Sequence, residues 1–260
     1  MSNSEIRQWA DIVLECRNTY AVMTINRPAK RNAIDRANRQ AMRAALDYAA
    51  GRFAAIVLTG AGQTFCAGLD LKERKADIDL GIHTASHEWM EVNVAVRQHP
   101  AIFIAAVNGT ALGGGSTLIN VCDLAIAADT ARIGMPELSF GVYPGLAGPA
   151  VQLTMTRKRA AWMILTAEQI SAATALEWGM LNQVVKPDEL LAQAELLAGR
   201  IAAYDPLALS AAKLAIDRIP AAITDWRQAF EFGDLVNAGI RQRRGGANPF
   251  AGALPKDRES

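Results

Sequence analysis

The chain has few of the residues that build disulfide frameworks and metal sites. Among its 260 residues, three are cysteine and three are histidine. Cys16, Cys66 and Cys122 are odd in number and none of them forms a C-x-x-C pair. The sequence therefore predicts neither a disulfide scaffold nor a thiolate metal site, and we expect no bound metal. Reduced thiols are typical of a cytosol-like compartment.

A large charge excess and long apolar runs are also absent. There are 27 Lys and Arg against 26 Asp and Glu, a formal net charge of +1. A sequence-independent nucleic-acid binder would need a clustered basic excess. No window approaches 18 uninterrupted apolar residues, and residues 1–5 are polar, unlike a secretory signal. We therefore expect a cytoplasmic protein that binds neither nucleic acid nor membrane.

What is present is a globular composition, with 51% hydrophobic and 20% charged residues. Strand-like and helix-like segments alternate as far as about residue 187, and helical patterns alone follow, which indicates an α/β core with a C-terminal helical appendage. We expect strands over 12–16, 20–25, 55–59, 102–107, 124–128 and 132–134, and helices over 35–48, 116–120, 171–178, 187–204 and 206–243. The charged segment 72–98 is predicted to be a mobile loop followed by a helix, and 245–249 a loop.

Two glycine-containing turns are the most informative feature. Phe65–Leu71 reads FCAGLDL and Gly109–Gly115 reads GTALGGG, and each follows an apolar strand-like stretch. Small-residue turns leave backbone N–H groups outside the sheet, and two such groups can bind one developing oxyanion. The triplet has neither the Gly-Lys-Ser/Thr of a phosphate-binding loop nor a G-x-G-x-x-G fingerprint, so a nicotinamide cofactor is not implied.

At these turns the chain resembles the crotonase family, the enoyl-CoA hydratase/isomerase superfamily. The segments that carry the resemblance, in order, are Asn26-Arg27-Pro28 with Asn32-Ala33, Gly60, Phe65–Leu71, Ala105–Gly109 with Ala111–Gly115, Cys122-Asp123-Leu124, Pro136-Glu137 with Gly141, Leu165-Thr166 and Gly179–Asn182. The resemblance implies a spiral of ββα units with a C-terminal helical trimerisation region. It also implies acyl-CoA thioester chemistry through an enolate.

Residue by residue, the resemblance implies an oxyanion hole and a coenzyme A site. The hole would use the backbone amides of Leu69 and Gly114. The residues that it implies for coenzyme A are Lys30, Arg31 and Ala33 near the phosphates and adenine, and Ala67, Leu69, Asp70 and Leu71 along the adenine and pantetheine. Coenzyme A would enter as part of the thioester substrate, with no tightly bound cofactor.

The acid/base residues depart from the family's hydratase pattern. Hydratases of this family use two glutamates, and the two positions here hold Thr117 and Glu137. A threonine hydroxyl can position water, but it cannot cycle protons near neutral pH as a carboxylate can. We therefore expect Glu137 to act alone, and we leave open whether Thr117 takes a direct part or packs. Asp70 is expected to orient its loop rather than react.

Several activities remain compatible with this pattern. The leading expectation is an enoyl-CoA hydratase/isomerase-type enzyme with a single glutamate acid/base. A hydroxycinnamoyl-CoA hydratase-lyase is an alternative, since those enzymes carry a small hydroxyl residue at the position of Thr117. A non-catalytic acyl-CoA binding protein is another. A serine hydrolase using Ser116 is a fourth, but the three histidines all fall within 83–99.

We divide the chain into a crotonase-like core with the acyl-CoA site, residues 1–195, and a helical region, residues 196–260. The second region is expected to serve oligomerisation and to cover the pocket. A homotrimer or a dimer of trimers is the expected assembly.

Overall fold

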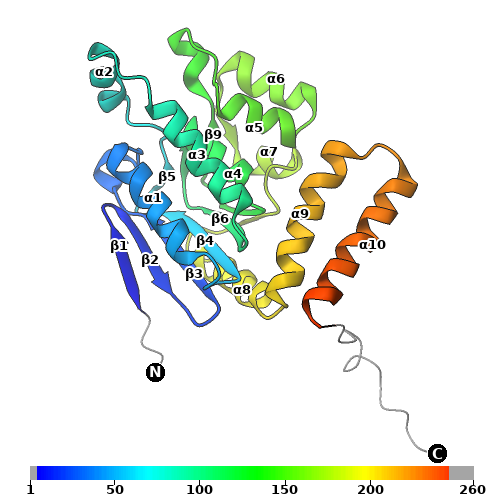
Figure 1. Cartoon of the computed structure of the whole chain (residues 1–260). Coiled ribbons are helices and arrows are strands. Elements are labelled where there is room, and N and C mark those ends of the chain that lie inside the picture. Colours follow the sequence, from blue (N-terminus) through cyan, green and yellow to red (C-terminus); the bar gives the residue numbers. More distant parts are fainter. Residues whose placement is uncertain (1–4, 246–260) are drawn as a thin grey trace, which may run out of the picture. The chain divides into compact units, whose positions relative to one another are not determined.

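The computed structural model of the chain describes residues 5–245. The contacts between Cα atoms divide it into two compact units, with the boundary between Ala203 and Tyr204. All the strands of the described residues lie in the first unit, and the helices α9 and α10 lie in the second (Figure 1).

A seven-stranded sheet forms the centre of the first unit. Its order is β1 (Ile6–Trp9), β2 (Ile12–Cys16), β3 (Tyr20–Ile25), β4 (Ala55–Gly60), β6 (Ile102–Val107), β8 (Leu124–Ala128) and β11 (Gln183–Val185). The first three strands pair antiparallel, and the rest of the sheet is parallel. Every residue of β4 and β6 is buried, as expected of parallel strands covered on both faces. Helix α8 (Leu190–Ala202) packs on these two strands.

A second, four-stranded sheet runs beside the first. Its order is β10 (Ile170–Ser171), β9 (Arg132–Gly134), β7 (Thr110–Leu112) and β5 (Thr64–Cys66). The pairs β4/β5, β6/β7 and β8/β9 each give one strand to the large sheet and the next to the small one. Helices follow these pairs: α2 (Leu71–Asp79), α3 (Ala85–Gln98), α4 (Gly114–Val121), then α5 (Ala147–Thr154), α6 (Arg157–Thr166) and α7 (Ala172–Glu177) after the 3₁₀ turn η2 (Pro136–Phe140). The predicted spiral of ββα units is confirmed.

The N-terminal hairpin and the first helix agree with the sequence prediction. Strands β2 and β3 pair in the predicted places. Helix α1 (Arg36–Ala49) begins after Asp35, whose side chain accepts a hydrogen bond from the amide of Asn38 at 2.9 Å. An Asp at this position satisfies an amide that has no partner inside the helix.

The prediction of a mobile loop at the start of 72–98 is wrong. Helix α2 begins directly after the first glycine turn, and only the residues between Asp79 and Ala85 separate it from α3. Asp70 is the N-cap of α2, accepting hydrogen bonds from the amides of Lys72 and Glu73. The helix buries one residue, Asp77, and no apolar one, so it lacks the apolar stripe by which a helix is recognised in a sequence.

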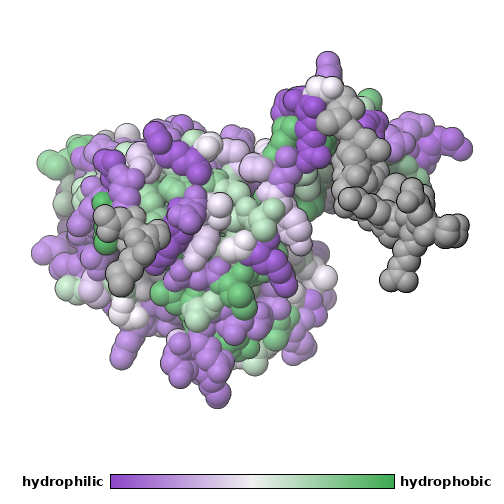
Figure 2. Space-filling view, turned by 90° about the horizontal axis from the view of Figure 1, so that it is seen from below, coloured by the Kyte–Doolittle hydropathy of each residue, from purple (hydrophilic) through white to green (hydrophobic). Residues whose placement is uncertain are grey.

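The second unit contains α9 (Pro206–Ala222) and α10 (Trp226–Arg243), which pack against each other. The helix predicted over 206–243 is thus two helices, each capped by an aspartate, Asp205 and Asp225. The loop predicted over 245–249 lies outside the described residues, apart from Gly245. Hydrophilic residues cover most of the face seen in Figure 2, with smaller hydrophobic areas between them. Within residues 5–245 no helix is long and apolar enough to cross a membrane.

Candidate active site

The two glycine turns meet in the structure. A Cβ atom added to Gly68 would lie 3.0 Å from the backbone nitrogen of Gly114, and one added to Gly114 would lie 3.4 Å from the Cα atom of Gly68. Gly68 also has φ +85°, a conformation that costs residues with a Cβ atom about 1–2 kcal/mol. Glycine is therefore required at position 68 both by its conformation and by the closeness of the second turn.

The amides of Leu69 and Gly114 are both unused by the described residues. The amide of Ile34 donates to the carbonyl of Gly68, and the amide of Asp70 donates to the carbonyl of Ile34. In this parallel bridge the N–H of Leu69, between them, points away from Ile34. Gly114 is the first residue of α4, where helical amides have no partner inside the helix. The positive end of the α4 dipole adds to the field at Gly114.

A cavity of about 480 Å³ opens beside these amides. It is lined by residues of both turns, of α2, α3 and η2, and of the segment before α5: Ala67, Gly68, Leu69, Leu71, Arg74, Ile78, Ser86, Trp89, Gly113, Gly114, Pro136, Glu137, Phe140, Val142, Tyr143, Gly145, Leu146 and Ala147. Most of these side chains are apolar, as is usual for a pocket that receives a small molecule. Glu137 is the only acidic residue among them.

Glu137 presents its carboxyl group to the second turn. It stands in the first turn of η2, and a Cβ atom on Gly113 would lie 2.6 Å from its Oε1 atom. Its Oε2 atom is buried and has no hydrogen-bond partner within residues 5–245. Burial raises the pKa of Glu137, opposed by a hydrogen bond from its own backbone and by the positive charge of Arg74. A carboxyl with a raised pKa can exchange protons closer to neutral pH than an ordinary glutamate.

A second cavity, of about 310 Å³, lies next to the first turn. It is lined by Ala29, Lys30, Arg31, Ala33, Ala67, Leu69, Asp70, Leu71 and Lys72, a set that includes all seven residues implied for coenzyme A. Ala67, Leu69 and Leu71 line both cavities, so the two spaces share a wall formed by the first turn. Lys30, Arg31 and Lys72 give the second cavity three cationic side chains, which suit phosphates.

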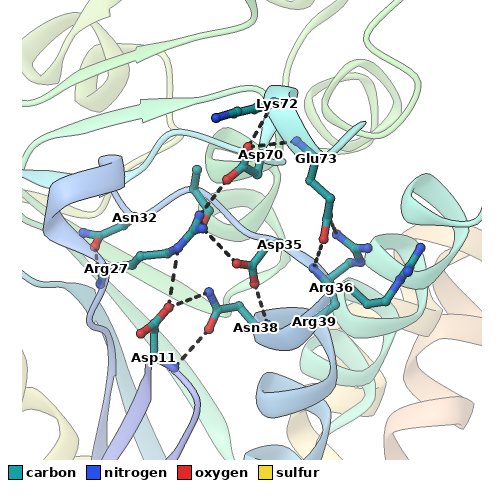
Figure 3. Close-up of polar contacts among 11 residues, drawn as sticks. Asp11, Arg27, Asn32, Asp35, Arg36, Asn38, Arg39, Asp70, Lys72 and Glu73 are labelled. Atoms are coloured by element: carbon teal, nitrogen blue, oxygen red, sulfur yellow. Dashed lines mark hydrogen bonds and ion pairs between the residues drawn. The ribbon is translucent and has the colours of Figure 1, made fainter. Parts of the chain in front are cut away.

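Asp70 is engaged in a structural network at the edge of this second cavity. Figure 3 shows Arg27 between three carboxylates, those of Asp11, Asp35 and Asp70. The bond from Arg27 to Asp70 measures 2.8 Å. Burial opposes ionisation of Asp70, but this bond and the two capping amides of α2 lower its pKa. Asp70 thus stays ionised and ties the turn to the N-terminal loop.

Thr117 and Ser116 do not reach either cavity. The Thr117 side chain is buried, and its hydroxyl donates to the carbonyl of Gly113 at 3.3 Å, one helical turn back. The Ser116 hydroxyl is buried and has no hydrogen-bond partner in the described part of the chain, which includes all three histidines, so no histidine activates it. The geometry gives no support to the serine hydrolase alternative.

Cys66, at the start of the first turn, is not a nucleophile. Burial raises the pKa of its thiol to about 12, against the effect of the Gly68 amide, which donates to the sulfur at 3.4 Å. The thiol therefore remains protonated at neutral pH.

Trp89 and Arg74 are among the cavity residues that the sequence analysis missed. Trp89 of α3 is fully buried, and its indole nitrogen, which has no partner among residues 5–245, lies next to Gly114. Arg74 lies on α2, in the segment predicted to be a loop. Helical spacing would have shown that Trp89 is buried, but nothing in the sequence connects either residue to the turns.

Comparisons with known proteins agree with this architecture. The family model described as enoyl-CoA hydratase/isomerase matches residues 15–228. The chain is 35% identical over 232 residues to the short-chain-enoyl-CoA hydratase of Clostridium acetobutylicum, covering 85% of this chain and 86% of that protein. It is 31% identical over 259 residues to the hydroxycinnamoyl-CoA hydratase-lyase of Pseudomonas fluorescens, covering 95% of this chain and 92% of that protein.

Among solved structures, the enoyl-CoA hydratase of Bacillus anthracis superimposes with a TM-score of 0.82 at 29% identity, covering 93% of this chain and 92% of that one. The family match extends over more than half of the chain and spans both glycine turns and Glu137. The chain therefore belongs to the enoyl-CoA hydratase/isomerase family, the crotonase superfamily, whose members process acyl-CoA thioesters.

Proposed function

We propose that this protein is an enoyl-CoA hydratase/isomerase-type enzyme in which Glu137 is the only acid/base and the amides of Leu69 and Gly114 form the oxyanion hole. One observation carries the proposal: Glu137, whose buried Oε2 atom has no hydrogen-bond partner among residues 5–245, lines the same cavity as two unused backbone amides. A buried polar group without a partner is costly, and its retention is explained if a substrate supplies the partner.

In the proposed reaction, the thioester oxygen accepts hydrogen bonds from the two amides. When negative charge moves onto that oxygen, the amides and the α4 dipole stabilise it without reorganising. Because both donors are main-chain groups, the side chain of Leu69 does not interfere with hydrogen bonding by its amide. That side chain lines the pocket. Removal of one such donor typically costs about 10²–10³ in kcat.

Glu137 then moves a proton on the acyl chain. As a carboxylate it can take a proton from Cγ or Cα, the electron pair passing into the enolate, and return the proton at the other carbon. This double-bond shift needs no co-reactant. Hydration is the second candidate, supported by the names of the relatives: water adds its hydroxyl group to Cβ, its other proton passes to the Glu137 carboxylate, and Glu137 delivers that proton to Cα. A direct part for Thr117 remains open, and the hydrogen bond of its hydroxyl to the carbonyl of Gly113 does not favour it.

Coenzyme A would occupy the second cavity. Lys30 and Arg31 are proposed to bind its phosphates, with Ala33 near the adenine. The shared wall of Ala67, Leu69 and Leu71 would carry the pantetheine toward the thioester site, with Asp70 holding the turn in place. Loss of acyl-CoA affinity at low salt in the double variant Lys30→Ala, Arg31→Ala is the expected outcome, and unchanged affinity would contradict this assignment.

The test of the catalytic proposal is Glu137→Gln, with Glu168→Gln as a matched control. Glu168 is exposed and lines neither cavity. General acid–base catalysis contributes about 10²–10⁴ in rate, so Glu137→Gln should lose at least that much turnover while binding coenzyme A normally. The control should keep full activity. Full activity in Glu137→Gln would refute the proposal.

The reaction itself is resolved by mass spectrometry of enoyl-, 3-hydroxyacyl- and aryl-CoA thioesters in deuterated water. Deuterium without added oxygen indicates isomerisation, added oxygen indicates hydration, and a shortened chain indicates the hydratase-lyase alternative. Binding of every thioester without turnover would leave the non-catalytic acyl-CoA binder as the function.

We also propose a homotrimer or a dimer of trimers, formed in part by the second unit. Trp226, Phe230 and Leu235 of α10 are between 66 and 77% exposed in the single chain. Apolar side chains of this size are usually covered in a stable assembly. Light scattering at micromolar concentration tests this proposal, and a monomer would contradict it.

A further inference from the structure

Arg74 is a cation that the proposed chemistry does not use, in the cavity of about 480 Å³ beside Glu137, which would hold the acyl group and is called the acyl cavity below. It lies on α2, half-buried, and lines the same cavity as Glu137. Among residues 5–245, no hydrogen bond or ion pair engages its guanidinium group. Arginine is the side chain best suited to bind a carboxylate, through two parallel hydrogen bonds.

The acidic residues around Arg74 on its own helix are already committed. Asp70 pairs with Arg27, and Asp77 pairs with Arg36 at 3.1 Å. Glu73 accepts hydrogen bonds from Arg39 at 3.0 Å and from the amide of Arg36 at 2.8 Å. The helix therefore supplies no carboxylate to its own arginine.

The rest of the cavity also provides no counter-ion. Glu137 is its only acidic lining residue, and no ion pair joins it to Arg74 within the described part of the chain, although the charge of Arg74 lowers the pKa of Glu137. The remaining wall around Arg74 is mainly apolar, with Ile78, Phe140 and Val142. An unpaired charge beside an apolar wall is unfavourable unless a ligand pairs with it.

Arg74 is separate from the cations assigned to coenzyme A. Lys30, Arg31 and Lys72 line the second cavity, and Arg74 does not. Lys72 and Arg74 are two residues apart on a helix, a spacing at which side chains do not face the same side. Ser86, in the first turn of α3, lines the acyl cavity and offers a hydroxyl donor near the positive end of that helix.

We infer that Arg74 binds a carboxylate at the far end of the acyl group, so that the substrates are coenzyme A monothioesters of dicarboxylic acids. This inference rests on the proposed function for the position of the thioester. It assigns Arg74 a part in specificity rather than in proton transfer. The apolar side chains between Glu137 and Arg74 would contact the methylene groups that join the two ends.

The experiment compares two 2-enoyl-CoA substrates of equal chain length, one ending in a carboxylate and the other in its methyl ester, over a series of lengths. For the best length, the wild-type protein should prefer the carboxylate by at least about tenfold in kcat/KM. Arg74→Gln should abolish this preference while the methyl ester keeps its rate within a few-fold. Lys72→Gln, on the same helix, should lower kcat/KM for both substrates equally.

The ratio of kcat/KM between the two substrates separates an effect on specificity from any indirect effect of Arg74 on Glu137. An equal loss for both substrates in Arg74→Gln, or no carboxylate preference at any length in the wild-type protein, would overturn the inference. Calorimetric binding of the corresponding saturated thioesters distinguishes it from the proposed function. A carboxylate preference in binding that Arg74→Gln removes would support the inference even if no enoyl thioester turned over.

Discussion

Two walls of the acyl cavity are built in different ways. The glycine wall, formed by the turns at Gly68 and Gly114, is held by backbone groups in close contact. The α2 wall is held by long charged side chains that join it to other helices. Arg39 of α1 is 1% exposed at its side chain and reaches Glu73 of α2 and Glu88 of α3.

The first wall is fixed by close backbone contacts between small residues, and the second is fixed by ion pairs between side chains. Backbone contacts at the glycine wall need small residues and leave no room for a Cβ atom, so the wall has one arrangement. The α2 wall buries no apolar residue, and its position depends on ion pairs with Arg36 and Arg39 of α1. The glycine wall suits the fixed hydrogen bonds of an oxyanion hole, and the α2 wall can vary without disturbing them.

The largest effect is expected from breaking the glycine wall with Gly68→Ala. The added Cβ would lie 2.8 Å from the carbonyl oxygen of Leu112 and 3.0 Å from the nitrogen of Gly114, so the turns must separate. Loss of aligned donors should lower kcat by about 10²–10³. Gly179→Ala is the control, because Gly179 has a similar φ of +84° and nothing within 4 Å. Equal activity in the two variants would contradict a catalytic role for this close approach.

The α2 wall is tested by Arg39→Met, compared with Arg43→Met on the same helix. Arg39→Met leaves Glu73 and Glu88 without their buried partner and should lower the free energy of unfolding by about 2–3 kcal/mol, toward the low end for a buried pair because both glutamates are partly exposed. Arg43 forms an exposed pair with Asp47, worth about 0.5 kcal/mol or less.

Denaturant unfolding measures the free energy of unfolding of both variants. Steady-state kinetics of the variants that remain folded then sharpens the comparison. Because α2 lines the acyl cavity and not the oxyanion hole, Arg39→Met should raise KM several-fold with a smaller change in kcat. A loss confined to kcat would show that the two walls are not independent.

The smallest expected effects are changes in stability with pH, and they have opposite signs at Glu137 and Glu88. Burial raises the pKa of Glu137, so its native state binds the proton more tightly and stability falls as the pH rises from its unfolded pKa through its folded one. Hydrogen bonds from Thr84 and Arg39 lower the pKa of Glu88 in the folded protein. The stability that Glu88 contributes is therefore present above its pKa in the unfolded chain and is lost as the pH falls through its pKa in the folded protein.

Thermal unfolding as a function of pH tests these signs. At neutral pH, Glu137→Gln should be more stable than the wild-type protein and Glu88→Gln less stable. We expect Tm to rise in the first variant and to fall in the second, by a few degrees at most. Both differences should shrink toward pH 3. Shifts of the same sign at the two sites would contradict the contrast between them.

The sequence predicted most of the strands of the large sheet and the first helix, because their apolar residues recur at the period of the element. It missed β1, and it missed the short strands β5, β7, β10 and β11, which have two or three residues each and no room for a period. It also missed α2, whose stability comes from its aspartate cap and from ion pairs with arginines more than thirty positions away. Pairs of this kind leave no local pattern.

For the candidate site, the sequence supplied Leu69, Gly114 and Glu137, and the structure brings all three to one cavity. It also supplied the residues of the second cavity. It did not supply Arg74 or Trp89, and it left open a direct part for Thr117, whose hydroxyl bonds within α4. Which face of a helix lines a cavity depends on how the helix packs, and the residue type alone does not determine that.

The sequence by itself determined the buried parallel strands, the two turns that only glycine can form, and the presence of one candidate acid/base. Each of these is a local property of composition or spacing. The tertiary structure alone decided that α2 is a helix, that the turns share one cavity with Glu137, and that Arg74 lines this cavity without an ion pair to any of the residues 5–245. Those outcomes depend on contacts between residues far apart in the chain, whose energies are set by burial and distance.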